Sequence, residues 1–439
     1  MSITVYSAAV VVPVTAPAVA GGAVAVQDGR ILHLGTRDWV LRVLAGAPEV
    51  REVHWDGVLL PGLVNAHTHL QYTGMAAIGQ RQYAGFEDWM GAFDAVYEAG
   101  GHDWRAHAAI GAELSLAAGV TGLADVITDA EAVSALADAG LRGVSYWEVI
   151  GWVNDRWRAD GLARVEAELD RIPTPPAIGI SPHAPYSLET EPLLDLPDVA
   201  RRRGARLHIH LGESRAEQGP LSGPRDETWR TVDTESFQAL RRDGFATSAT
   251  DFVDQLGVLG PDCHIAHGVY LNAHDREVLR ARTTAVALCP RSNRVIGLDE
   301  PPVAAYLLEG NPIAVGTDSL ASSPSLDLLA DVAALHDIAR RQGYTGADLS
   351  HRLLRAATLG GAIALGMATG PDRVGQLQVG ALADLAFVDL PATGVRDAIE
   401  GVVTDGAGRV AATLLGGEVR WSSAAWLARA DADEAVSRR

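Results

Sequence analysis

The chain contains no lysine, because every one of its 36 residues counted as Lys or Arg is Arg. Without a side-chain amine, the protein cannot form a Schiff base through lysine or bind a phosphate through the lysine of a Walker-type loop. A lysine-derived ligand bridging two metal ions is excluded for the same reason. Any chemistry must therefore be carried by other groups.

Cysteine and positive charge are also scarce. Cys263 and Cys289 are the only cysteines, which excludes a disulfide framework; we expect both in the core of a protein from a reducing compartment. A formal net charge of −19 argues against nucleic acid or an anionic membrane as partner, since both attract positive surfaces. A small-molecule substrate is the expected partner. The sequence is compatible with a homodimer but does not determine the oligomeric state.

Long uninterrupted apolar runs are absent. The stretch from Ala8 to Val26 has no basic residue before its apolar part and is broken by Pro13, Pro17 and Gly21, so it predicts strands with turns rather than a signal peptide. No run is long enough to span a bilayer. We therefore expect a cytoplasmic protein.

The middle of the chain predicts a parallel barrel. At 439 residues and 48% hydrophobic content, the chain exceeds one average domain and can bury a large core. Between residues 61 and 371, apolar runs alternate with helical patterns, as in βαβ units. The eight predicted strands are Leu63–Ala66, Val120–Asp125, Leu141–Trp147, Ala177–Ser181, Arg206–His210, Cys263–His267, Thr284–Leu288 and Pro312–Asp318. Eight strands close a (β/α)8 TIM barrel, an α/β fold that carries its working residues at the carboxyl ends of its strands.

Both chain ends predict short strands that cannot close a core alone. Those in residues 1–60 are Ser2–Tyr6, Ala23–Gln27, Ile31–Leu34 and Glu52–His54, and those in residues 372–425 are Gly375–Leu377, Ala383–Asp389, Val410–Leu415 and Glu418–Trp421. We expect the two sets to combine into one small β-sandwich domain flanking the barrel. The tail from Ala424 is predicted to be helical.

The stretch from Leu60 to His69 is the most informative one. A short apolar run follows Pro61 and Gly62 and ends in His67 and His69, as expected of a buried strand that delivers two imidazoles to its carboxyl end. Alternate strand residues point to the same side, so both rings can bind one ion. The tripeptide alone is equally compatible with two loop histidines, and a metal site requires further ligands downstream.

Two further ligands are available at other strand ends. His210 closes the fifth predicted strand and Asp318 the eighth. His208 lies on the same side of its strand, so spacing alone does not exclude it, but His210 is nearer the strand end. Asp318 could instead cap the next helix. Three neutral imidazoles and one carboxylate suit a borderline ion such as zinc and leave a position for water.

Hydrolysis at such an ion needs groups that move protons. A bound metal lowers the pKa of water to near 7. His267, at the end of the sixth strand, is a candidate proton acceptor beside that water, and a purely structural role is its alternative. Asp318 can also shuttle a proton, whereas His264 is expected to be an ordinary strand residue.

Glu213 follows His210 by three residues and is expected on a loop above the ion. A carboxylic acid there can donate a proton to a ring nitrogen of a heterocycle while hydroxide attacks the adjacent carbon. A solvent-exposed loop residue is the alternative. His183, flanked by prolines, is expected to contact the substrate, and Asp125 and Glu148 are interpreted as polar groups at the barrel end.

Several of these stretches together resemble the amidohydrolase superfamily. They are Leu60–His69, Ser181–Ser187, His210–Ser214, His264–Gly268, Gly316–Asp318 and, near the carboxyl terminus, Val379–Leu385. They are most similar to the branch of deaminases and chlorohydrolases that act on purines, nucleosides and triazines. The resemblance covers nearly the whole chain and implies a barrel enzyme with a flanking β-sandwich. Since a carboxylated lysine cannot form, it implies one divalent ion, expected to be zinc.

The resemblance also implies roles for individual residues. The ion would be bound by His67, His69, His210 and Asp318; Glu213 would donate a proton to the substrate ring, His267 would orient and activate the water, and His183 would contact the substrate.

Three stretches are most similar to aminodeoxyfutalosine deaminases: His210–Glu217, Cys289–Arg294 and Gly316–Ser323. The resemblance implies removal of the 6-amino group of 6-amino-6-deoxyfutalosine, an adenine nucleoside that carries a benzoate, on a bacterial route to menaquinone. Arg81, Arg291 and Arg294 are candidates for the group that would bind its carboxylate.

Other functions remain open. The first alternative is a deaminase for S-adenosylhomocysteine, methylthioadenosine or guanine, and the second is a triazine chlorohydrolase. A binding protein without catalysis is a third, against which the full set of candidate residues argues. The polar segment Gly219–Gly244 is interpreted as either a lid or an interface.

Overall fold

The computed structural model describes residues 2–218, 248–391 and 394–429, so the segment Gly219–Gly244 lies outside the described residues. The chain divides into two compact units. One comprises residues 1–65, 113–123 and 327–439, and the other comprises residues 66–112 and 124–326. The boundaries predicted at residues 61 and 372 stay a prediction.

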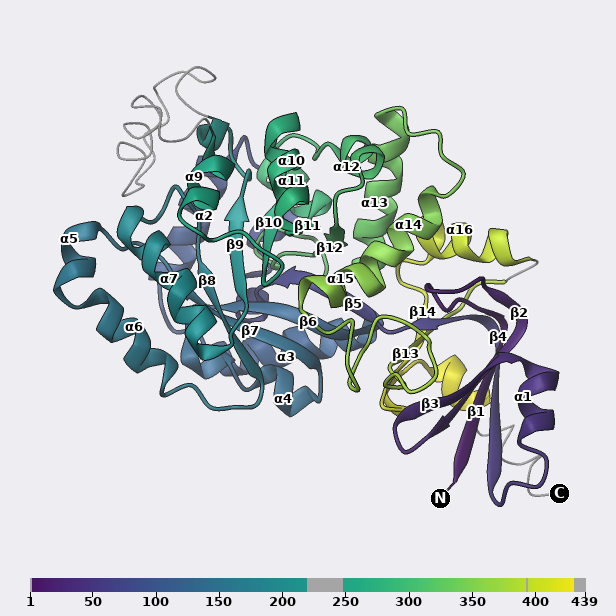
Figure 1. Cartoon of the computed structure of the whole chain (residues 1–439). Helices are drawn as coiled ribbons and strands as arrows, with labels where there is room; N and C mark the ends of the chain where they lie inside the picture. The colour runs from purple at the N-terminus through teal and green to yellow at the C-terminus, as the bar shows by residue number, and fades with distance from the viewer. Residues whose placement is uncertain (1, 219–247, 392–393, 430–439) are drawn as a thin grey trace. The chain divides into compact units, whose positions relative to one another are not determined.

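Eight strands form one sheet in the order β12-β11-β10-β9-β8-β7-β6-β5, with sequence neighbours side by side (Figure 1). They are β5 (Leu63–Thr68), β6 (Val120–Ile127), β7 (Arg142–Val149), β8 (Ala177–Pro182), β9 (Leu207–Leu211), β10 (Cys263–His267), β11 (Ala285–Leu288) and β12 (Ile313–Val315). All residues of β5, β6, β9, β10 and β11 are buried, as expected when both faces of a parallel sheet are covered. The predicted barrel is confirmed.

The two ends of this sheet meet at the carbonyl of His67. The backbone amides of Thr317 and Asp318 both donate to this carbonyl, at 3.1 and 3.0 Å. Gly316 continues the pairing on the other side by donating to the carbonyl of Leu288 at 3.0 Å. The strand predicted over residues 312–318 is therefore shorter than expected. β12 ends at Val315, and residues 316–318 turn to close the barrel.

Helices follow the barrel strands along the chain. Those in or reaching the unit that contains most of the barrel are η1 (Leu70–Met75), η2 (Ile78–Gln80), α2 (Phe86–Glu98), α3 (Trp104–Ala117), η3 (Ala130–Ala132), α4 (Ala135–Ala139), α5 (Asn154–Arg156), η4 (Trp157–Gly161), α6 (Leu162–Leu169), α7 (Thr190–Arg203), η5 (Arg215–Gln218), α9 (Ala249–Gln255), α10 (Ala273–Arg282), α11 (Pro290–Ile296) and α12 (Val303–Glu309). Local sequence sets their ends. Asn272 and Asp275 form a reciprocal capping box at the start of α10, and Gly310 ends α12 in a left-handed conformation.

The other unit contains a seven-stranded mixed sheet in the order β15-β14-β13-β4-β1-β2-β3. Its strands are β1 (Ile3–Val11), β2 (Val19–Gln27), β3 (Arg30–Thr36), β4 (Val50–Pro61), β13 (Leu385–Val388), β14 (Val410–Leu415) and β15 (Glu418–Ser422). Figure 1 shows purple strands from the amino terminus beside yellow-green ones from the carboxyl terminus. A flanking β domain built from both chain ends is confirmed, although residues 375–377 form no strand.

This unit also contains α1 (Arg37–Val43), α13 (Leu328–Arg341), α14 (Leu349–Arg355), η6 (Ala356–Gly360), α15 (Gly361–Ala364) and α16 (Val395–Asp405). Residues 424–429 are helical, in agreement with the predicted helical tail. Both cysteines are buried and form no disulfide with each other, as expected.

No helix among the described residues is long and apolar enough to cross a bilayer.

We expect Gly316→Ala to destabilise the protein. A Cβ atom at this position would lie 2.8 Å from both the Cys289 Sγ and the His67 Cβ, where the barrel closes. Overpacking of this kind costs about 1–3 kcal/mol of unfolding free energy, measurable by guanidinium titration. Gly91→Ala is the control, because no atom lies within 4 Å of the added methyl group. Equal unfolding midpoints for both variants and the parent protein would contradict tight packing at the closure.

Candidate active site and metal centre

His67 and His69 lie at the carboxyl end of β5, where both side chains are buried. Their Nε2 atoms lie 3.5 and 3.7 Å from the same oxygen, Oδ1 of Asp318. The loop after His69 is held by Asp125, whose Oδ1 accepts the amide of Leu70 at 2.9 Å. The first and last strands of the barrel thus bring their polar ends together.

Asp318 is oriented by donors on its second oxygen. Oδ2 accepts hydrogen bonds from the hydroxyl groups of Ser292 at 2.6 Å and Ser322 at 2.8 Å. Oδ1 accepts the amide of Ser319 at 2.7 Å and is the oxygen that faces the histidines. The two serines therefore determine which oxygen is presented. Sequence reasoning assigned them no role, because serines after a strand are common.

Burial and charge shift the pKa values in opposite directions here. Burial would raise the pKa of Asp318, but hydrogen bonding and charge from His67, with further histidines, outweigh it and hold this pKa well below its usual range. Burial lowers the pKa of His69 to about 3 and also lowers that of His67. Burial thus favours the neutral form of the imidazoles, whereas the hydrogen bonds on Asp318 favour its ionised form.

The structure distinguishes His210 from His208. The Nδ1 of His210 donates to the carbonyl of His183 at 3.0 Å, which leaves Nε2 as the free lone pair, and burial holds its pKa well below the usual value. His208 lies deeper among the strands, where its Nδ1 is 3.2 Å from the hydroxyl of Ser181. His210 lines the cavity described below and His208 does not. Spacing alone could not make this distinction.

These residues fit a metal ion. Ligand atoms of His67, His69 and Asp318 lie within 4.8 Å of one another, and so do those of His67, His210 and His267. Neutral imidazoles with one carboxylate are the ligands that zinc takes. The Nδ1 of His69 is buried without a hydrogen-bond partner among the described residues, and the Nε2 of His210 is left for a ligand. The geometry also permits His267 as a ligand.

Glu213 lies on the loop after β9 and is buried, not solvent-exposed. Its Oε1 lies 3.4 Å from Nε2 of His267, and its Oε2 accepts the hydroxyl of Tyr186 at 2.7 Å. Burial raises the pKa of Glu213, while charge from His267 and the hydrogen bond from Tyr186 oppose the rise. A carboxyl group with a raised pKa is suited to donate a proton.

His267 is oriented through its other nitrogen. Nδ1 lies 3.2 Å from Oδ1 of Asn293 and donates to it, so Nε2 is presented toward Glu213. By contrast, Nε2 of His264 donates to the carbonyl of Ala66 at 2.9 Å within the barrel, in the structural role expected for it. Sequence reasoning assigned Asn293 no role, because it lies in α11, distant in sequence from His267.

Two site residues have left-handed backbone conformations. His267 has φ of 73° and Asp318 has φ of 57°, a region that residues other than glycine rarely occupy. Each such residue costs of order 1–3 kcal/mol, and surrounding contacts must maintain it. The polar network around both side chains supplies such contacts.

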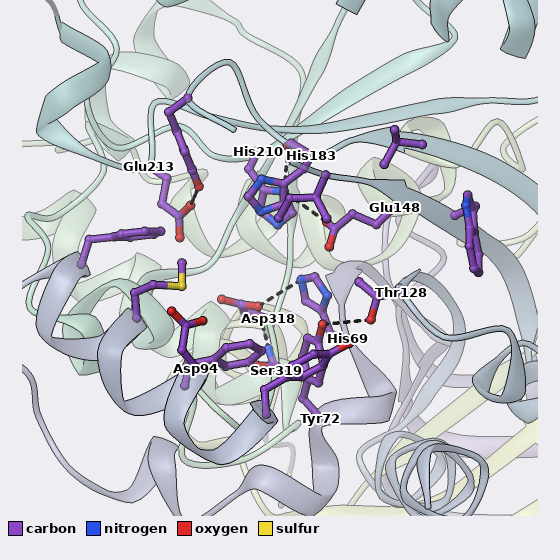
Figure 2. A pocket seen from close by; sticks show the side chains of 18 of the residues that line it. His69, Tyr72, Asp94, Thr128, Glu148, His183, His210, Glu213, Asp318 and Ser319 are labelled. Carbon is purple, nitrogen blue, oxygen red and sulfur yellow. Dashed lines mark hydrogen bonds and ion pairs between the residues drawn. The ribbon is translucent and has the colours of Figure 1, made fainter. Parts of the chain in front are cut away.

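A cavity of about 410 Å³ opens above this cluster (Figure 2). Its polar lining includes His69, His183, His210, Glu213 and Asp318. One wall is a face of α2, formed by Phe86, Trp89, Met90, Phe93 and Tyr97. Further apolar surface comes from Trp147, Val149, Ile150, Trp152 and Val165. The regular helical spacing of the α2 side chains was a sequence signal, but core packing produces the same pattern.

Figure 2 shows further carboxyl groups directed into the cavity, those of Asp94 and Glu148. Burial raises the pKa of Glu148 to about 8. His183 also lines the cavity, with Nδ1 2.6 Å from the hydroxyl of Ser187. Asp125 does not line it, although Glu148 does, so the two residues grouped at the barrel end by sequence reasoning differ in position.

The arginines considered for a substrate carboxylate lie elsewhere. The guanidinium of Arg81 lies 4.4 Å from the ring centre of Tyr83, and Arg291 donates to the hydroxyl and carbonyl of Ser325. Arg294 is exposed. Among the described residues, no arginine lines the cavity.

Curated relatives match most of the chain. A 5-methylthioadenosine/S-adenosylhomocysteine deaminase of Moorella thermoacetica is 29% identical over 403 residues, covering 87% of this chain and 84% of that protein. An enzyme of the same name from Syntrophobacter fumaroxidans is 31% identical over 388 residues, covering 84% and 80%.

Solved structures share the fold over nearly the full length. A Xanthomonas campestris adenosine deaminase with bound zinc has a TM-score of 0.77 at 23% identity, covering 99% of this chain and 98% of that one. A Helicobacter pylori aminofutalosine deaminase has a TM-score of 0.76 at 20% identity, covering 95% of this chain and 99% of that one. An atrazine chlorohydrolase of Arthrobacter aurescens, complexed with zinc, has 0.78 at 20%, covering 99% of both.

The model of the amidohydrolase family matches residues 58–420, from within β4 to within β15. This stretch contains every residue of the cluster and cavity described above. The chain belongs to the amidohydrolase family and is a hydrolase of that type.

Proposed function

We propose that this protein is a metal-dependent aminohydrolase that releases ammonia from the 6-position of an adenine nucleoside. The observation that carries the proposal is the position of Glu213. Its buried carboxyl group lies 3.4 Å from His267 and lines the same cavity as Asp318 and the histidine cluster. An acid and a base thus face one cavity, as addition of water across a ring C=N bond requires.

A divalent ion, which we propose to be zinc bound by His67, His69, His210 and Asp318, would supply a nucleophile from water at neutral pH. The residues themselves manage the protons. Glu213 donates a proton to the ring nitrogen as water adds to the adjacent carbon. His267 orients the water, and Asp318 accepts one of its protons and passes it to the departing amine.

Proton balance is satisfied by this set. The product keeps the proton on its ring nitrogen, the departing amine takes the proton from the added hydroxyl group, and the other proton of water restores Glu213. His183, whose ring centre lies 4.7 Å from that of His210, contacts the substrate from the cavity wall. Tyr186 donates to Glu213 and orients its carboxyl group toward the ring.

The nucleoside substituent is the second part of the proposal. The curated relatives are named for methylthioadenosine and S-adenosylhomocysteine, and apolar side chains of α2 and β7 line the cavity, which suits a thioether. We therefore place these substrates ahead of 6-amino-6-deoxyfutalosine.

A triazine chlorohydrolase is the second candidate, favoured by the TM-score of 0.78 to the Arthrobacter enzyme. At 20% identity this likeness concerns the fold. A buried acid such as Glu213 is compatible with release of either ammonia or chloride, so the two functions are distinguished by measuring the products.

A substrate panel tests the proposal. We expect ammonia release from 5′-methylthioadenosine and S-adenosylhomocysteine, with kcat/KM of at least about 10⁴ M⁻¹s⁻¹ for one of them, as is usual for an enzyme acting on its own substrate. The panel also contains adenosine, 6-amino-6-deoxyfutalosine, guanine and atrazine. Faster turnover of the futalosine compound would restore the menaquinone assignment, and chloride release without ammonia release would replace deamination.

Asp318→Asn should abolish ammonia release. The neutral amide cannot act as an ionised ligand or accept the proton, so we expect a loss of more than about 10²-fold in kcat together with less bound metal in elemental analysis. Chelation of the parent protein should have the same effect and be reversed by zinc. Asp299→Asn, at an exposed pair with Arg215, is the control. Full activity of a metal-free protein would contradict the metal role.

Glu213→Gln should lower kcat by roughly 10²-fold or more, the usual scale for a positioned acid, with metal content unchanged. The pH profile is diagnostic. Because Glu213 must be protonated to act, kcat/KM should fall as pH rises through its raised pKa, and Glu213→Gln should lack this limb. Tyr186→Phe removes a hydrogen bond that lowers this pKa, so its limb should move to higher pH. If kcat/KM of Glu213→Gln still falls over the same pH range, the titrating group is a residue other than Glu213.

A further inference from the structure

Glu217 is a buried carboxyl group that the mechanism above does not use. It lies in η5, and 4% of its surface is exposed. Its Oε2 accepts the amide of Gly212 at 2.7 Å, and its Oε1 accepts the amides of Glu213 and Ser214 at 2.9 Å each. Three consecutive backbone N–H groups therefore converge on one side chain, which does not line the cavity.

The same turn is held from its other side. The carbonyl of Gly212 accepts the amides of Val269 and Tyr270 at 2.9 and 2.8 Å, just beyond His267 at the end of β10. Gly212 has φ of 66°, and a Cβ atom there would lie 2.5 Å from Leu271. The turn after β9 is therefore bound on one side to the connection after β10 and on the other to Glu217.

The two oxygens of Glu217 suit this position because both accept hydrogen bonds from the backbone amides. Burial raises the pKa of Glu217 to about 8, and the charge of Glu213 adds to the rise, whereas the three amides oppose it because they bind the ionised form. The two oxygens of Glu217 together accept all three hydrogen bonds, so no other side chain is needed to bind these amides. A glutamine at this position would direct its NH2 group toward a backbone N–H group, and at least one of the three hydrogen bonds would be lost.

We propose that Glu217 is a positioning residue that fixes the backbone of Gly212–Ser214 so that the Glu213 carboxyl group meets the substrate ring. The inference rests on the acid role proposed for Glu213. Displacement of a catalytic group by about 1 Å is enough to cost of order 10²-fold in rate. Glu217 acts through Glu213 and touches neither substrate nor metal.

A double-mutant cycle tests this with the full-length holoenzyme and 5′-methylthioadenosine. We expect Glu217→Gln to lower kcat by about 10- to 100-fold, with a smaller change in KM and unchanged metal content. In the Glu213→Gln background, Glu217→Gln should change kcat by less than about 2-fold, because its effect passes through Glu213. Full multiplicative effects in the double variant would overturn the proposal, as would unchanged kcat in Glu217→Gln.

Two further variants separate positioning from folding. Glu217→Asp keeps the charge but is too short for all three amides, so its kcat should lie between those of the parent and Glu217→Gln. Asp384→Asn alters another buried carboxyl group that accepts a backbone amide, that of Gly416 at 2.8 Å, in the flanking-sheet unit. It should lower stability without changing kcat. An equal loss of kcat in Asp384→Asn would show a general folding effect and overturn the proposal.

A readout without turnover keeps the result separate from the proposed function. In protein labelled with ¹³C at glutamate carboxyl groups, the signal lost in Glu213→Gln identifies Glu213, and its titration midpoint should move in Glu217→Gln. If no panel compound yields ammonia but the midpoint moves, the proposed function fails and the positioning role stands. An unmoved midpoint overturns the positioning role, whatever the activity.

Discussion

The site depends on keeping one buried carboxylate ionised. Asp318 lies where the barrel closes, and its backbone amide donates to the carbonyl of His67, whose ring faces its side chain. The serines that bind its second oxygen and the neighbouring histidines offset the cost of burying the charge. Glu213 has fewer compensating donors, and burial raises its pKa. Two carboxyl groups in one cavity are thus suited to opposite proton-transfer roles.

Much of the fold follows from local sequence. All eight barrel strands could be predicted, because fully buried parallel strands appear as short apolar runs separated by helical periods. The errors occurred where local pattern and tertiary role differ. Leu377 packs into the core of the β domain and its amide donates to the carbonyl of Pro13 at 3.1 Å, but residues 375–377 form no strand. Residues 316–318 leave the strand to close the barrel. Pairing partners distant in sequence decide both cases.

For the candidate site, the strand-end residues could be predicted from the sequence, but the residues that support them could not. Strand-end position brought the histidines, Asp318 and Glu213 together, since parallel strands end at one face. The supporting residues could not be assigned, because Ser292, Asn293 and Tyr186 acquire their roles only from partners on other connections. The arginines were misplaced for the same reason: charge and motif proximity do not reveal which wall of the cavity a side chain reaches.

The burial of Cys289 makes it a natural reporter of barrel opening. Its thiol has no exposed surface and lies behind Gly316, beside the residues where the first and last strands meet. An alkylating reagent can reach this sulfur only when the closure separates, so the labelling rate of the native protein measures the local free energy of that opening. Because the same backbone places His67 beside Asp318, a ligand that binds the cluster would also slow the thiol reaction.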